Sequence, residues 1–73
     1  MALNLALARR KRRWLDLTQA EVARRIGVHE VTLSKWERGE QEPKVTDAAA
    51  WAKALDLELA DLLAEPTPEE ATA

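Results

Sequence analysis

Four closely spaced side chains are of types that bind the edges of nucleic-acid bases: Glu30, Val31, Ser34 and Lys35. Lysine donates hydrogen bonds to guanine O6 and N7, glutamate accepts one from cytosine N4, and valine contacts the methyl group of thymine. In a helix, these residues would line the face opposite the apolar Leu33 and Trp36. An exposed valine on that face has no core to fill. The pattern therefore predicts four base-reading residues. For Glu30 the alternatives are that it repels phosphate or only caps the helix start.

Polar residues that can bind DNA phosphates stand at the ends and edges of the same region: Thr18, Gln19, Thr32 and Arg38. Gln19 begins an expected helix, whose free backbone N–H groups and dipole attract an anion, and its side chain can add a hydrogen bond. Arg38, together with the main-chain N–H groups around Gly39, is a stronger candidate than Thr32 for a contact to the phosphate backbone of DNA. The simpler alternative for Gln19 is a surface glutamine at a helix start.

Residues 19–38 are expected to form two short helices joined by a tight turn. Apolar and small residues stand where such a pair must close on itself: Val22, Ala23, Ile26, Val28, Leu33 and Trp36. Ala23 allows the second helix to cross the first closely, and Gly27 can adopt a positive φ at little cost. This spacing predicts a helix-turn-helix, whose second helix fits a DNA major groove. The alternative is an ordinary helical hairpin in a small bundle.

Five helices and no strands are expected, so the predicted fold class is all-α. The first helix covers about residues 3–14, with Asn4 as its cap and with Leu5, Ala8 and Leu15 buried at helical spacing. Arg12 falls on the same apolar stripe, and a charge in that position needs a partner.

The later helices have recognisable ends. Thr18 and Glu21 form a capping box before the second helix, and His29 caps a third helix over about residues 29–38, which stops at Gly39. A fourth helix begins at Lys44 or Thr46, and its expected inward face consists of Val45, Ala48, Ala49, Trp51, Ala52 and Leu55. A short fifth helix contains Leu59, Leu62 and Leu63.

Length and composition indicate one small domain over residues 1–64, followed by a disordered acidic tail over residues 65–73. The chain has no cysteine and a single histidine, His29, so no metal site is expected. We find no nucleophile with a neighbouring base and no glycine-rich phosphate loop. We therefore expect no enzyme, no cofactor and no small-molecule ligand. No apolar run approaches the roughly 20 residues of a membrane span, and we expect a cytoplasmic protein.

Charge is distributed unevenly along the chain, whose formal net charge is −2. Residues 1–44 hold ten Lys or Arg against six Asp or Glu, a balance of +4, and residues 45–73 hold one against seven, a balance of −6. A basic amino-terminal half suits a domain that presents one side to phosphates. The basic run at residues 9–13 is expected to be the solvated face of the first helix rather than a nuclear signal or an RNA-binding arm.

Three segments carry a resemblance to a known family: LTQAEVARRIGV, LSKWERGEQEPK and AKALDLELADLL. Over about residues 5–63 the chain resembles the DNA-binding domain of phage repressors, Cro proteins and their bacterial relatives, the xenobiotic-response-element type of regulator. The resemblance implies a compact five-helix, lambda-repressor-like fold with the helix-turn-helix in its second and third helices. It also implies that Arg12 and Glu37 form a buried ion pair and that Gln19 binds phosphate.

Three positions depart from the family pattern. Asp16 and Asp56 stand where the family often has glycine, but aspartate tolerates left-handed backbone better than most residues. Lys11 replaces a usually apolar residue on the first helix.

The residues and the resemblance together predict a sequence-specific, double-stranded DNA-binding regulator of transcription, of the repressor type and encoded by a bacterium or phage. One module of this size buries little DNA surface, so we expect a homodimer on a palindromic operator. Its contact would lie in the carboxyl-terminal helix and use Leu57, Leu59 and Leu63, which have the alternative of only closing the core. Alternative hypotheses for the function are an antitoxin whose acidic tail binds a toxin, a protein-binding adaptor on the same fold, and a redesigned DNA binder.

Overall fold

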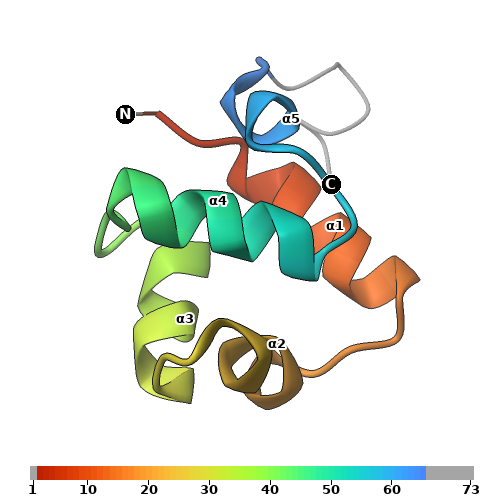
Figure 1. Ribbon diagram of the computed structural model, residues 1–73, viewed down its shortest axis with the longest axis vertical. Helices are drawn as coiled ribbons and strands as arrows, with labels where there is room; N and C mark the ends of the chain where they lie inside the picture. Colours follow the sequence, from red (N-terminus) through yellow and green to blue (C-terminus); the bar gives the residue numbers. More distant parts are fainter. Residues whose placement is uncertain (1, 66–73) are drawn as a thin grey trace.

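The computed structural model describes residues 2–65, which form five helices and contain no strand (Figure 1). The helices are α1 (Leu5–Trp14), α2 (Gln19–Ile26), α3 (Glu30–Glu37), α4 (Val45–Ala54) and α5 (Leu59–Leu63). The all-α prediction with five helices is therefore confirmed. The predicted tail lies outside the described residues except for Glu65, which is exposed. No helix within residues 2–65 has the length and apolar character of a membrane span.

The helices pack around α4, which contacts α2 on one side and α5 on the other (Figure 1). α1 contacts both α3 and α5, and α2 packs against α3. The core that they enclose consists of Ala8, Val22, Ala23, Leu33, Trp36, Trp51, Ala52, Leu55 and Leu62. The two tryptophan rings meet inside it, with centroids 5.5 Å apart and planes inclined at 44°. The small alanines beside them leave room for this large pair.

Helix caps form at the residues that the sequence indicates. The Asn4 side chain accepts a hydrogen bond from the Leu7 N–H at 3.0 Å, and Asn4 therefore precedes α1 rather than lying within it. His29 Nδ1 accepts from the Val31 N–H at 3.1 Å and caps α3. Gly27, at φ 85°, ends α2 in the left-handed region that glycine enters without strain. Each cap satisfies a backbone donor or ends a helix where the next segment must turn.

Aspartate takes the left-handed backbone at both turns where the family pattern has glycine. Asp16 has φ 57° after α1, and Asp56 has φ 60° after α4. Both residues are exposed, so their side chains are accommodated without displacing the core. The expectation that these positions keep the turn is confirmed.

The prediction of buried positions is wrong at several residues. Val45 is 61% exposed and Ala49 is exposed, because α4 buries only the stripe of Ala48, Trp51, Ala52 and Leu55. Val45 is the first residue of α4, and Ala49 lies about 100° around the helix from Ala48. On α1, Ala8 is buried but Leu5 and Leu15 are only half-buried.

Candidate nucleic-acid interface

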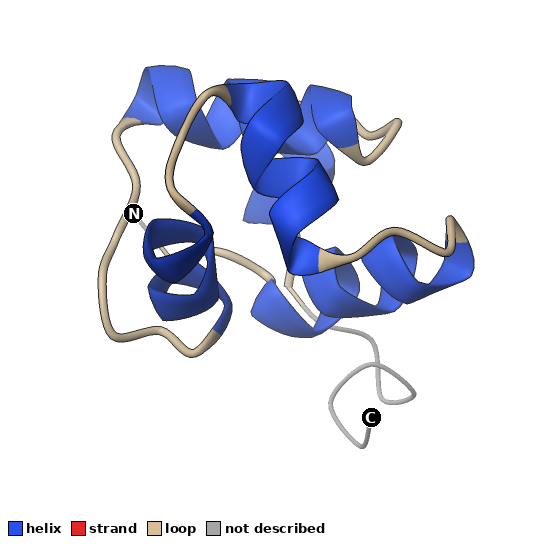
Figure 2. Cartoon of the chain, turned by 90° about the horizontal axis from the view of Figure 1, so that it is seen from below, coloured by secondary structure: helices blue, strands red, loops and turns tan. Residues whose placement is uncertain are grey.

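The outer face of α3 carries the residues predicted to read bases. Glu30, Val31 and Lys35 are exposed, and Ser34 is half-buried. Val31 is 52% exposed, although valine is an apolar residue that usually lies in a core. The opposite face of α3 buries Leu33, Trp36 and Glu37. α2 and α3 occupy the lower side of the molecule in Figure 1, and Figure 2 views the molecule from that side.

A hollow of about 500 Å³ lies where the end of α1, the start of α2 and the start of α3 come together. Its lining consists of Arg12, Arg13, Asp16, Leu17, Thr18, Gln19 and Glu30. Two residues predicted to bind phosphate, Thr18 and Gln19, thus share one concave site with two arginines. Glu30, predicted as a base reader, also lines this hollow.

Thr18 and Glu21 form the predicted capping box at the start of α2. The Thr18 hydroxyl accepts from the Glu21 N–H, and the Thr18 N–H donates to the Glu21 carboxylate, both at 3.1 Å. The hydrogen bond from the Thr18 backbone, followed by that from its side chain, lowers the pKa of Glu21 below its ordinary value. The capping box therefore stabilises the folded state fully at pH values above the unfolded-state pKa of Glu21. This stabilisation is lost as the pH falls through the lower folded-state pKa.

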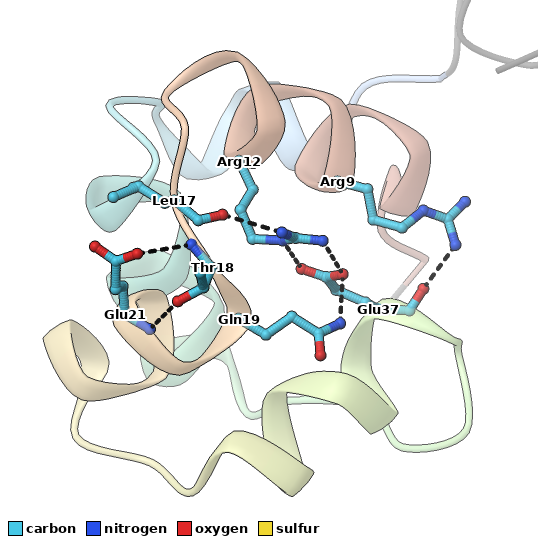
Figure 3. A network of polar contacts seen from close by, with 7 residues as sticks. All are labelled: Arg9, Arg12, Leu17, Thr18, Gln19, Glu21 and Glu37. Carbon is cyan, nitrogen blue, oxygen red and sulfur yellow. Dashed lines mark hydrogen bonds and ion pairs between the residues drawn. The ribbon is translucent and has the colours of Figure 1, made fainter.

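Arg12 and Glu37 form an ion pair in the interior between α1 and α3 (Figure 3). Arg12 Nε donates to Glu37 Oε2 at 2.8 Å, and Arg12 Nη2 donates to Oε1 at 3.2 Å. The Glu37 side chain is 2% exposed and that of Arg12 is 14% exposed. This is the partner that Arg12 requires on its apolar stripe.

The pair extends into a network that joins three helices (Figure 3). Arg12 Nη1 donates to the Leu17 carbonyl at 3.0 Å, which ties the turn between α1 and α2. Arg9 Nη1 donates to the Glu37 carbonyl at 3.2 Å, which ties α1 to the end of α3. Gln19 Nε2 donates to Glu37 Oε1 at 2.9 Å. The sequence analysis missed the contacts of Arg9 and Gln19, although Arg9 lies three residues before Arg12 on one helix face.

Arg38, predicted to bind phosphate, lies beside the residues predicted to read bases. Its Nη1 donates to Ser34 Oγ at 2.9 Å, and its Nε pairs with the Glu40 carboxylate. The spacing of four residues between Ser34 and Arg38 was the available signal for this contact. The side chains of Arg38 and Glu40 are each 54% exposed, so both groups remain in contact with solvent. The other edge residue, Thr32, is half-buried.

Comparison with known proteins identifies the family of the chain. A helix-turn-helix family model matches residues 9–62. The chain belongs to the helix-turn-helix family. Over 59 residues it is 39% identical to the antitoxin HigA1 of Mycobacterium tuberculosis, in both the CDC 1551 / Oshkosh and the ATCC 25618 / H37Rv strains. That match covers 81% of this chain and 40% of each relative, so the chain spans well under half the length of these relatives.

The structure of this helix-turn-helix chain is similar to the solution structure of the DNA-binding domain of the P22 C2 repressor. The TM-score is 0.78 at 36% sequence identity, and the match covers 84% of this chain and 80% of that domain. The resemblance to the phage-repressor family is thereby confirmed. In this helix-turn-helix, α2 and α3 are the paired helices and α1 supplies the arginines of the buried network.

We predict that removing either partner of the Arg12–Glu37 pair destabilises this helix-turn-helix domain. Arg12→Ala or Glu37→Ala leaves one buried charge without its counterion, at a cost of about 3–5 kcal/mol. Replacing both residues together, as in Arg12→Met/Glu37→Met, leaves no unpaired charge and should cost much less. Chemical denaturation of the three variants measures these differences. Equal stabilities for wild type and both single variants would show that the pair is solvated.

Proposed function

We propose that the chain is a sequence-specific, double-stranded DNA-binding regulator of transcription, of the repressor type, which inserts α3 into the major groove. The observation that carries the proposal is the division of α3 into two faces. One face packs into the core with Leu33 and Trp36, and the other exposes Val31 and Lys35 to solvent. An exposed helix face with a methyl-bearing side chain and a cation suits base edges. The helix-turn-helix family and the similarity to the P22 C2 repressor domain support the same function.

Phosphate contacts on either side of α3 would supply most of the affinity. The hollow at the start of α2 offers Thr18 and Gln19 beside Arg13, and Arg38 lies near the other end of α3. Backbone N–H groups at a helix start add a favourable dipole for an anion. Glu30 and Asp16 oppose a phosphate in the same hollow. Arg12 is already paired with Glu37, so Arg13 is the arginine of the hollow that remains for a phosphate. This arrangement supports binding that weakens as salt rises.

We propose that the chain binds a palindromic operator as a homodimer, in the cytoplasm and without a cofactor or small-molecule ligand. A single module covers too little DNA for useful affinity, whereas two copies cover two half-sites. The proposed contact lies in α5, where Leu63 is 46% exposed. Leu57 and Leu59, also predicted for this contact, are half-buried and add a smaller accessible area. Leu62 takes no part because it is buried in the core.

The phosphate anchors are tested by Gln19→Ala and Arg38→Ala. Each variant should weaken binding to all duplex sequences by a similar factor, because phosphates carry no base information. Gel-shift titrations with a selected site and with an unrelated duplex measure both affinities. Gln41→Ala is the matched control, since Gln41 is an exposed glutamine in the loop after α3. A changed sequence preference with unchanged non-specific affinity would contradict the anchoring role.

Base reading and symmetry are tested by selection of binding sites from random duplexes. Lys35→Ala should relax the preference at one base pair of each half-site, at a cost of about 1–3 kcal/mol there. Val31→Ala should weaken the preference for a neighbouring thymine by a smaller amount, because only methyl contacts are lost. The affected positions should recur by two-fold symmetry about one helical turn apart. Selected sites without an inverted repeat would argue for a monomeric reader.

A second candidate function is that of an antitoxin that also binds DNA. The specific observation in its favour is the 39% identity to the antitoxin HigA1. Co-expression of this chain with a toxin neutralised by such relatives tests it, with restored growth as the expected result. Lys35→Ala should keep neutralisation and lose operator preference if separate surfaces serve the two activities. Continued growth arrest with soluble, folded chain present would oppose the antitoxin function.

A further inference from the structure

Gln19 does not project freely from the start of α2 but is held from inside the molecule. Its Nε2 donates to Glu37 Oε1 at 2.9 Å, and Glu37 belongs to the last turn of α3 (Figure 3). We propose that Glu37 is a positioning residue for phosphate binding, which orients the Gln19 amide so that a second N–H remains for a DNA phosphate. The inference rests on the proposed function, because it assigns a DNA-binding role to a buried residue that touches no DNA.

The chemistry of the two groups determines which end of the amide faces inward. A primary amide has two N–H donors and a carbonyl acceptor, whereas an ionised carboxylate only accepts. Glu37 can therefore bind only the nitrogen end of Gln19, and the arrangement with the amide oxygen turned inward is excluded by repulsion between two acceptors. A freely rotating Gln19 would present its oxygen to a phosphate part of the time, and that orientation is repulsive.

Glu37 is itself immobilised, so it can act as a rigid support. Its carboxylate accepts from Arg12 at 2.8 and 3.2 Å and is almost entirely buried. Arg12 also binds the carbonyl of Leu17, two residues before Gln19. The acceptor and the backbone that carries Gln19 are thus fixed to the same guanidinium. Rigid support of this kind removes the cost of ordering a flexible side chain when a ligand binds.

The expected consequence is a uniform gain in DNA affinity. Ordering one flexible side chain costs an amount that corresponds to about a two- to tenfold change in the dissociation constant. The change should be the same for a selected operator and for an unrelated duplex, since the contact is to phosphate. A purely structural role of Glu37 predicts instead an effect on α3 and the core that does not depend on Gln19.

Two double variants separate these roles, and both have the net charge of the wild type. Arg12→Met/Glu37→Met removes the acceptor for Gln19, whereas Arg12→Met/Glu37→Gln retains an amide oxygen at position 37. The first should bind an unrelated duplex about two- to tenfold more weakly than the second. In a Gln19→Ala background the two should bind equally. Equal binding with Gln19 present, or the same difference in both backgrounds, would overturn the proposal.

The proposal can also be tested on the wild-type chain, so that the result does not depend on the folding of a variant. The sequence contains two glutamines, and Gln41, exposed in the loop after α3, is the internal reference for Gln19. The side-chain amide of Gln19 should show restricted motion by NMR relaxation and slow hydrogen exchange, unlike that of Gln41. A Gln19 amide as mobile as that of Gln41, in a chain that binds DNA, would overturn this inference alone. Failure of the wild-type chain to bind any duplex would overturn the proposed function and the phosphate role together.

Discussion

The carboxylate of Glu37 is the group on which the arrangement of the candidate interface depends. It binds the Arg12 guanidinium and the Gln19 amide, and its residue also receives a hydrogen bond from Arg9. A buried carboxylate without these donors would carry a desolvation penalty of several kcal/mol. The three helices that meet there must therefore keep one relative position. The start of α2 and the end of α3 are held as parts of one rigid unit, although the chain between them turns at Gly27.

The residues of α3 that pack in the core and those proposed for recognition lie on opposite sides of the helix. Leu33, Trp36 and Glu37 face inward and serve packing and the buried network. Val31 and Lys35 face solvent and contribute nothing to the core. Substitutions on the outer side are therefore expected to change what the helix binds with little effect on folding.

Much of the secondary structure follows from local residue patterns that can be recognised in the sequence. Asn4, Thr18 and His29 cap helices because each places a side-chain acceptor before an apolar repeat. Burial at helix ends was predicted less well. Val45 and Leu15 fit an apolar period, but Val45 is exposed and Leu15 is only half-buried. Periodicity indicates which face a residue lies on, whereas burial also requires something to lie opposite.

The sequence by itself determined the five helices, the caps of the first three, the glycine and aspartate turns and the polar face of α3. Each of these depends on residues within a few positions of one another, and short-range hydrogen bonds and steric limits decide them. The family resemblance already implied the pairing of Arg12 with Glu37, but tertiary structure alone decided that Arg9 and Gln19 also meet at Glu37, which is up to 28 residues away in the chain. Tertiary structure also placed Glu30 beside Thr18 and Gln19 in one hollow. Such contacts depend on how the helices cross, and helix crossing depends on the packing of side chains from elements far apart in the sequence rather than on any local pattern.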